Sequence, residues 1–283
     1  KPVIRGETVV FHNPSCLRFD RSFAERISCE RLVVVTHENF LRPGDALGFD
    51  VKHCLGLLEQ SSVCRTRILA PVSPHNRLGV SEWQRLNDGA WQLADEDWFN
   101  VINLPLDPTS RAPRDRRGRH SRPGAEKFPP LSDLVRQFPE HAEHCAILGA
   151  DSLLDQGRRT PPYWQLLPFR SVSVADFLRR IDVFVYFTHP LWQESFGRVL
   201  AEAIAAGKLV ITDARTAEPF GDGVVAGTSE TVDDLVRSHL ERPALYARRV
   251  RKAQKALERY SPSRFADMVL RLVDGRVAGH AVV

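Results

Sequence analysis

The sequence predicts an α/β fold divided into two lobes, each built on a parallel β-sheet. Three observations support this prediction. Short apolar runs rich in β-branched residues recur along the chain, segments with helical periodicity lie between them, and a stretch rich in proline, glycine and arginine, residues 107–130, separates two such alternations. Paired lobes of this kind usually bind ligands at the carboxyl ends of their strands, so we expect an interlobe cleft.

Seven apolar runs are predicted to be strands. Each is short and has apolar residues at consecutive positions, which is typical of parallel strands that are buried on both faces. In chain order the predicted strands are residues 9–11, 31–36, 67–72, 99–104, 145–148, 181–187 and 208–212.

Capping residues mark the helices between these runs. Ser173 with Asp176, and Thr231 with Asp234, have the spacing of helix N-termini. Gly207 is expected just past a helix end, and Pro243 in a first helical turn. The pattern therefore predicts two helices before the predicted strand at 208–212 and two after it.

The arginine-rich stretch is predicted to be the boundary between the lobes. It contains six arginines between Arg111 and Arg122. The predicted division is a first lobe at 1–105, a second lobe at 106–261, and a helix within 262–283.

Composition excludes several classes of protein. The chain has 283 residues, of which 43% are hydrophobic and 26% charged, with a net charge of +4, which excludes a disordered or collagen-like chain. The small positive charge suits anionic ligands and does not by itself indicate nucleic acid. Five cysteines without a C-x-x-C pair favour reduced thiols. We therefore expect a cytoplasmic protein, whose excess arginines also suit peripheral attraction to anionic lipid at the inner membrane face.

Residues 181–213 contain the motif with the clearest chemistry, a strand, a loop, a helix and a second strand. Glu194 is predicted at the junction of loop and helix, with Ser195, Phe196 and Gly197 supplying the first helical amides, which form an anion site. Glu202 follows eight residues later, about 12 Å along the same helix. Two such carboxylates can accept hydrogen bonds from hydroxyl groups at two ends of one ligand. Alternatively, each is an ordinary helical glutamate.

The run Glu-Ser-Phe-Gly-x4-Glu-Ala-x-Ala-x-Gly-x-x-Val-Ile resembles the E-x7-E signature of retaining glycosyltransferases with the GT-B architecture, close to glycosyltransferase family 4. The resemblance implies two Rossmann-like lobes, of which the first, at 1–105, is the acceptor-side lobe. It further implies that the helix within 262–283 returns toward the first lobe, and that the first lobe is incomplete, because this architecture has one more strand and helix before the position of Val9. It also implies that Glu194 contacts the hydroxyls of the donor sugar, that Glu202 contacts the nucleotide ribose, and that the amides near Phe196 and Gly197 face the donor.

A Gly-Arg pair followed by a lysine binds the donor diphosphate in that family. The corresponding residues here are Arg119, which follows Gly118, and Lys127, although the spacing is stretched. An arginine fork and a lysine point charge would both neutralise a diphosphate. The neighbouring arginines are interpreted as a solvated linker, namely Arg111, Arg114, Arg116 and Arg117.

Two further positions in the first lobe resemble family features. His37 ends a predicted strand where many members place a histidine near the donor sugar and its phosphate, and His12 ends an earlier strand. Ser73 and Arg77 resemble the family's Ser-x-x-x-Arg at a helix start. For His37 a purely structural role remains open, because histidines at strand ends are more often structural.

Metal sites are not expected. Asp95-Glu96-Asp97 has the form of a metal-binding D-x-D, but it precedes a predicted strand and is interpreted as an acidic turn. His141 and His144 beside Cys145 lack a second ligand pair at zinc spacing. The motifs that would indicate a P-loop or a dinucleotide site do not occur in the sequence.

The sequence thus predicts a glycosyltransferase that moves a sugar from a nucleoside diphosphate sugar to an acceptor hydroxyl. Retention of anomeric configuration is implied by the resemblance, and no metal or cofactor is expected. The acceptor is a carbohydrate, a lipid-linked molecule or another small molecule. The alternatives are a nucleotide-sugar epimerase, a phosphorylase, for which no pyridoxal-type lysine is recognisable, and a non-catalytic nucleotide-sugar-binding subunit.

Overall fold

The computed structural model describes residues 2–41, 47–87, 91–155 and 160–273. The chain forms two compact units. Unit 1 contains the described residues up to Val101, the segment Glu194–Phe196 and the described residues from Tyr260 onward, and unit 2 contains Ile102–Gln193 and Gly197–Arg259. In the described part of the chain, no helix has both the length and the apolar character needed to cross a membrane.

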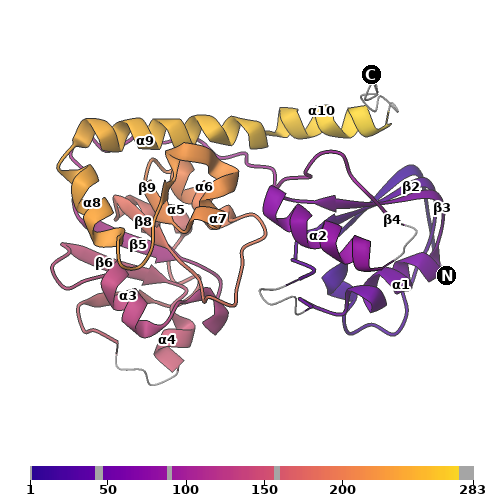
Figure 1. Cartoon of the computed structure of the whole chain (residues 1–283), viewed down its shortest axis with the longest axis horizontal. Helices are drawn as coiled ribbons and strands as arrows, with labels where there is room; N and C mark the ends of the chain where they lie inside the picture. Colours follow the sequence, from indigo (N-terminus) through magenta and orange to yellow (C-terminus); the bar gives the residue numbers. More distant parts are fainter. Residues whose placement is uncertain (1, 42–46, 88–90, 156–159, 274–283) are drawn as a thin grey trace. The chain divides into compact units, whose positions relative to one another are not determined.

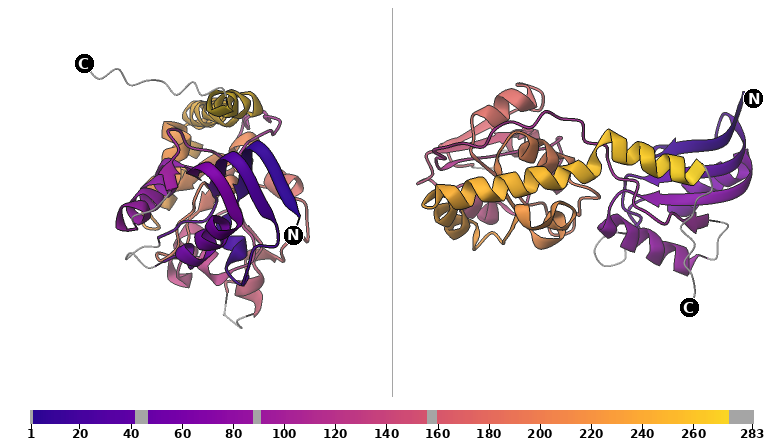
Figure 2. Two further views of the ribbon diagram at one scale, coloured as in Figure 1. Left: turned by 90° about the vertical axis from the view of Figure 1, so that its right-hand side faces the viewer. Right: turned by 90° about the horizontal axis from the view of Figure 1, so that it is seen from above.

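Unit 1 is built on a parallel sheet with the strand order β1-β2-β3-β4. Helices α1 and α2 pack on β3 (Figure 1), and the strands β1 to β3 run side by side in the left view of Figure 2. In chain order the elements are β1 (Val3–His12), the short 3-10 helix η1 (Pro14–Leu17), β2 (Arg26–Thr36), α1 (Val51–Ser61), β3 (Ser62–Pro71), α2 (Pro74–Leu86), β4 (Trp91–Leu93) and α10 (Pro262–Val273).

The core of unit 1 follows from the apolar runs of the sequence. Leu32 and Val34 of β2 are completely buried, and they pack with Leu58 of α1 and Val80 of α2. The carboxyl half of β2 is buried residue after residue, as expected of a parallel strand with both faces covered. Helix α10 joins this unit through Phe265, whose ring contacts Trp98 with centroids 5.7 Å apart.

Unit 2 has a six-stranded sheet, and all its strand pairs are parallel. The strand order is β10-β9-β8-β5-β6-β7, and the helices surround the sheet (Figure 1). Its elements are β5 (Arg116–His120), η2 (Ala125–Lys127), α3 (Leu131–Gln137), β6 (His144–Leu148), α4 (Asp151–Asp155), β7 (Trp164–Leu167), α5 (Val174–Arg179), β8 (Val183–Tyr186), α6 (Arg198–Ala205), β9 (Leu209–Thr212), α7 (Ala214–Ala217), η3 (Glu218–Gly223), β10 (Val225–Ala226), α8 (Val232–Leu240), α9 (Pro243–Ala256) and η4 (Leu257–Tyr260).

The strand order reverses between β5 and β8. From β5 the chain continues outward through β6 and β7, then returns to β8 on the other side of β5 and continues outward through β9 and β10. In a doubly wound sheet, the loops that leave two strands at such a switch point diverge and leave a crevice beyond their carboxyl ends. The loops after His120 and after Tyr186 therefore mark the expected ligand position of unit 2.

Six of the seven predicted strands are confirmed, and the seventh is wrong. Residues 99–104 contain no strand. Phe99 instead packs its ring against Tyr260 and Phe265, with centroids 5.3 and 5.8 Å apart, so its apolar surface is buried in an aromatic cluster and not in a sheet. The units divide between Val101 and Ile102, slightly before the division after residue 105 that the sequence suggested.

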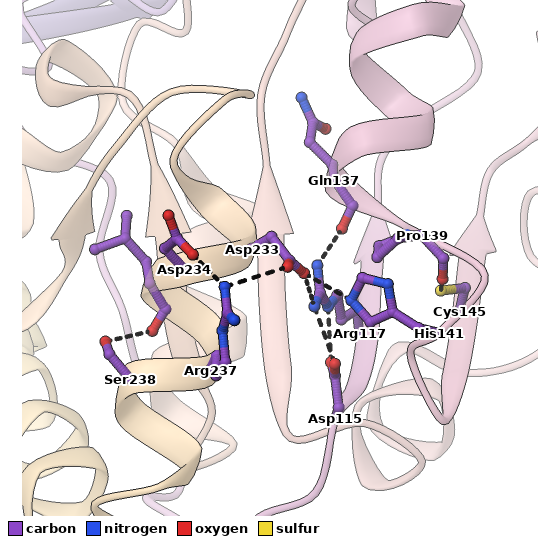
Figure 3. A network of polar contacts seen from close by, with 11 residues as sticks. Asp115, Arg117, Gln137, Pro139, His141, Cys145, Asp233, Asp234, Arg237 and Ser238 are labelled. Carbon is purple, nitrogen blue, oxygen red and sulfur yellow. Dashed lines mark hydrogen bonds and ion pairs between the residues drawn. The ribbon is translucent and has the colours of Figure 1, made fainter.

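The interpretation of Arg116 and Arg117 as a solvated linker is also wrong. Both belong to β5, a central strand of unit 2. Arg117 is 1% exposed, and its guanidinium donates to both carboxylate oxygens of Asp115, to Asp233 and to the carbonyl of Gln137 (Figure 3). Gly118 beside it gives Ile181 room, because a Cβ there would lie 2.7 Å from Cγ2 of that side chain.

The ion pairs of Arg117 predict a stability effect. Replacing Arg117 by leucine is expected to lower the free energy of unfolding by about 3 kcal/mol, because it leaves two carboxylates without their buried partner. Arg237 provides a matched control, since it faces the same Asp233 at 4.0 Å but is an exposed arginine. Its replacement by leucine is expected to cost less than about 0.5 kcal/mol. Denaturant unfolding of both variants checks this, and equal losses would contradict it.

The predicted helix ends are confirmed at all four positions, since Thr231 is the N-cap residue of α8. The Ser173 side chain accepts from the Asp176 amide, Gly207 has φ 74° just past α6, and Pro243 begins α9. The Thr231 side chain makes no cap hydrogen bond to α8, because its hydroxyl accepts from the Thr228 amide instead. All five cysteines are unpaired thiols, although Cys16 is exposed and only two of the five are fully buried.

Candidate functional site

Two cations follow β5 at the switch point of unit 2. β5 ends at His120, and Arg122, two residues later, is exposed. Lys127 ends η2 and is 5% exposed. Its Nζ lies 4.5 Å from the ring centroid of Trp192, in the loop after β8, and the guanidinium carbon of Arg122 lies 5.9 Å from the same centroid. An arginine and a lysine thus lie against the same indole ring, where a ligand diphosphate would meet both positive charges.

The loop after β8 is tied to η2 by main-chain hydrogen bonds. The His189 amide donates to the Glu126 carbonyl, and the Trp192 amide donates to the His189 carbonyl. The Thr188 hydroxyl donates to the Trp192 carbonyl. The position of Trp192 over the lysine is therefore set by the backbone of both loops.

Arg119 occupies a different place from the one predicted. Its side chain is completely buried, and its guanidinium donates to the carbonyls of Phe187 and Lys127. The rings of Phe128 and Tyr186 lie 4.5 and 4.8 Å from its guanidinium carbon. In this position Arg119 holds the main chain of Lys127 and the start of the loop after β8.

Arg122 was missed by the sequence analysis. Arg122 could have been predicted from its position relative to the end of β5. β5 continues through His120, so the first cation beyond the strand is Arg122, not Arg119. Four residues then separate Arg122 from Lys127, which is enough for one turn to bring both side chains to the same indole ring.

Helix α6 begins four residues later than Glu194. Gly197 is its N-cap, with φ 87° and ψ 48°, and Arg198 is its first residue. Glu194, Ser195 and Phe196 therefore precede the helix, and the prediction that Ser195, Phe196 and Gly197 supply its first amides is wrong. The amides without a partner inside the helix belong to its own first turn. The two glutamates consequently do not share one helix, and the 12 Å estimate does not apply.

Glu202 lies in α6, and its side chain is 22% exposed. Arg198, one turn earlier, donates from Nε to Oε1 of Glu202 at 3.2 Å. The other oxygen, Oε2, lies 3.6 Å from Nε2 of His120. Burial raises the pKa of the Glu202 carboxyl, and Arg198 opposes that shift. This carboxylate therefore stands beside His120, the last residue of β5, and Arg122 follows that residue two positions later.

In unit 1, two histidines meet at the carboxyl edge of the sheet. His12 ends β1 and His37 directly follows β2. Nδ1 of His12 lies 3.1 Å from Nε2 of His37, and the rings stack with centroids 5.4 Å apart. Burial, and then the charge of His12, lowers the pKa of His37. The lowered pKa keeps the His37 ring neutral at neutral pH.

The segment that contains Glu194 is anchored in unit 1. Phe196 packs its ring against Tyr260 with centroids 4.9 Å apart. The Ser73 hydroxyl donates to the Ser195 carbonyl, and it also accepts from the Asn76 amide as the N-cap of α2. Glu194 itself is half-buried.

The acidic turn before residue 99 binds arginines. Asp97 accepts from Arg77 at 2.6 Å, so Arg77 is engaged by this turn, and Glu96 accepts from Arg271 of α10. His141 is an exposed partner of Asp233, and the Cys145 thiol donates to a backbone carbonyl (Figure 3). Across the described ranges, no group of three or more His, Cys, Asp or Glu side chains could hold a metal ion.

Comparisons with known proteins identify the fold. No protein-family profile matches the sequence, and no curated protein matches it either. The structure is similar to that of TarM, with a TM-score of 0.64 and 14% identity over 94% of this chain and 54% of TarM. This chain thus spans about half the length of TarM.

Two other solved structures are similar. One is a trehalose-6-phosphate synthase studied for enzymatic glycosyl transfer with retention, with a TM-score of 0.66 and 12% identity over 95% of this chain and 74% of that one. The other is HepE of Anabaena in complex with UDP-glucose, with a TM-score of 0.63 and 17% identity over 87% of this chain and 72% of that one. The chain therefore has the α/β fold with parallel sheets found in GT-B glycosyltransferases.

Proposed function

We propose that this protein is a retaining glycosyltransferase that uses a nucleoside diphosphate sugar as donor. The observation that carries the proposal is the arrangement at the switch point of unit 2. Arg122 and Lys127, which follow β5, both lie against the Trp192 ring, and the Glu202 carboxylate stands beside His120 at the end of the same strand. A nucleoside diphosphate needs both, cations for the diphosphate and a hydrogen-bond acceptor for the ribose hydroxyls.

Each part of the donor has a proposed partner. Arg122 and Lys127 bind the diphosphate together with the first amides of α6, and Arg119 holds the Lys127 main chain in place. Glu202 binds the ribose, and Glu194 binds hydroxyls of the sugar, as the sequence resemblance implies. Uridine is the first base to test, because the HepE structures hold UDP-glucose and UDP.

The proposed reaction replaces one bond at the anomeric carbon by another. The bond from that carbon to the diphosphate oxygen breaks with both electrons leaving on the phosphate, and a bond to the acceptor oxygen forms on the same face. The leaving phosphate oxygen takes the acceptor proton, so no protein base is needed. Arg122 and Lys127 stabilise the negative charge that develops on the diphosphate. His37, neutral at neutral pH, positions the sugar and its phosphate.

The acceptor is proposed to be a hydroxyl of a carbohydrate, a lipid-linked molecule or another small molecule, reached from the cytoplasm or at the inner membrane face. Because two side-chain cations stand where the diphosphate is proposed to bind, the reaction is proposed to need no metal ion and no cofactor. Activity that survives thorough chelation would support this, and activity that returns only with a divalent cation would refute it.

Ligand binding tests the proposal directly. A ligand that binds only the native state raises its stability in proportion to affinity. UDP, GDP and their sugars are therefore expected to raise the melting temperature, whereas uridine alone, without the diphosphate, is expected to raise it much less. Release or transfer of the sugar from the stabilising donor then establishes catalysis. Binding without any turnover would favour a nucleotide-sugar-binding subunit, and binding of none of these ligands would refute the proposal.

A further inference from the structure

The side chain of His120 is buried at the carboxyl end of β5. The residue is 4% exposed, and its ring lies against Phe184 and Phe177, with centroids 5.3 and 6.1 Å away. Burial, and then the positive charge of Arg119, lowers the pKa of His120 to about 4, so the ring is neutral at neutral pH. Among the residues that the structure describes, Nε2 of this ring has no hydrogen-bond partner. A buried ring nitrogen of this kind is rarely left unsatisfied.

The Glu202 carboxylate is an acceptor close to this nitrogen. The distance from Nε2 to Oε2 is 3.6 Å, slightly beyond the range of about 2.7–3.2 Å for a hydrogen bond. A movement of Oε2 toward Nε2 by about 0.4 Å would bring the two atoms within hydrogen-bond range. The other oxygen, Oε1, is already held by Arg198. The carboxylate is therefore flanked by one donor on each oxygen.

With a donor on each oxygen, the carboxylate can still accept a limited number of further hydrogen bonds. Two carboxylate oxygens offer about four lone-pair sites. Arg198 occupies one and His120 would occupy a second, on the other oxygen. One site then remains on each oxygen, which is the number needed for two adjacent hydroxyl groups.

We propose that His120 is a positioning residue that donates from Nε2 to Glu202 and orients its carboxylate toward the 2′ and 3′ hydroxyls of the donor ribose. The inference rests on the proposed function, because it assumes that Glu202 meets a ribose. A neutral histidine suits this role, since it orients the carboxylate by a hydrogen bond without drawing it into an ion pair that would compete with the hydroxyls.

His239 provides the matched comparison. It is also 4% exposed, and among the described residues its Nε2 also has no hydrogen-bond partner. Its other nitrogen, Nδ1, donates to the Leu235 carbonyl at 2.7 Å within α8, and among the described residues the ring forms no ion pair with a carboxylate. If burial of an imidazole were the only contribution of His120, the two histidines would behave alike.

Discrimination between two nucleotides tests the role. Affinities for UDP and 2′,3′-dideoxy-UDP are measured by calorimetry for the native sequence, His120→Met and His239→Met. The native protein is expected to bind UDP at least about tenfold more tightly than 2′,3′-dideoxy-UDP, because a charge-assisted hydrogen bond gives a preference of this size. His120→Met is expected to lose most of this ratio through weaker UDP binding, with dideoxy-UDP affinity unchanged. His239→Met is expected to keep the ratio.

The outcomes separate the inference from the proposed function. A native protein that binds neither nucleotide would refute the proposed function. If the native protein prefers UDP and His120→Met keeps that preference, the inference alone would be overturned. The same holds if His120→Met weakens the binding of both nucleotides equally. If His120→Met does not fold, histidine 15N spectra of the unaltered protein decide the point. UDP, but not dideoxy-UDP, is expected to shift the Nε2 proton of His120, and equal shifts would overturn the role.

Discussion

Replacing Glu194 by glutamine is expected to reduce turnover about 100-fold or more while the fold stays intact. The proposed transition state carries positive charge on the sugar, and an ionised carboxylate on the sugar hydroxyls stabilises it more than it stabilises the ground state. The amide keeps the shape of the side chain but removes the charge and turns one acceptor oxygen into a donor. The loss should therefore appear in kcat, with a smaller change in KM for the donor.

The anchoring of the Glu194 segment makes this variant informative. Phe196 packs on Tyr260, and the Ser195 carbonyl accepts from Ser73, and neither contact involves the Glu194 carboxylate. The melting temperature is therefore expected to stay close to that of the native protein. Glu241→Gln, at an exposed position at the end of α8, is the matched control and should leave turnover unchanged. A Glu194→Gln variant with native kinetics would remove Glu194 from the proposed mechanism.

The apolar strands could be predicted because each has apolar side chains at consecutive positions, which is the pattern of a strand buried on both faces. β5 could not, because its sequence Arg-Arg-Gly-Arg-His contains no apolar side chain. The groups that make its burial possible come from distant parts of the chain. Asp182 accepts from Arg116 at 2.8 Å, and Asp233 accepts from Arg117 at 2.6 Å, across 66 and 116 residues of sequence. Local patterns cannot show such partners, so a buried strand was interpreted as a linker.

Because β5 was not predicted from the sequence, Arg122 was also overlooked as a site residue. With β5 treated as a linker, Arg119 was the natural candidate for the diphosphate, because it follows a glycine. The structure shows Arg119 between two aromatic rings inside the strand, and Arg122 beyond its end. The glutamate pair was found from its motif, but the start of α6 was set too early. Gly197 could have corrected this, because a left-handed glycine commonly breaks the chain direction at a helix boundary.

Replacing Lys127 by methionine is expected to have the second large effect, a loss of about 100-fold in kcat/KM. The lysine Nζ lies 4.5 Å from the Trp192 ring, and its cationic charge is held in a largely buried position. A buried cation acts on the leaving diphosphate through a lower dielectric than an exposed one, so its removal should cost more than the loss of a surface charge. Methionine is of similar length and fills the same space, so loss of packing contributes little.

A comparison of two ligands separates the charge of Lys127 from its packing. Calorimetry should show that Lys127→Met weakens UDP binding about tenfold or more and leaves the affinity for uridine unchanged, because only UDP carries the diphosphate. Lys252→Met removes an exposed lysine that pairs with Asp222 on the surface, and it should change neither affinity. Equal weakening of both ligands would mean that Lys127 shapes the site and does not neutralise the diphosphate. In that case Arg122 alone would remain as the proposed cation, and Arg122→Met should then produce the full diphosphate-specific loss.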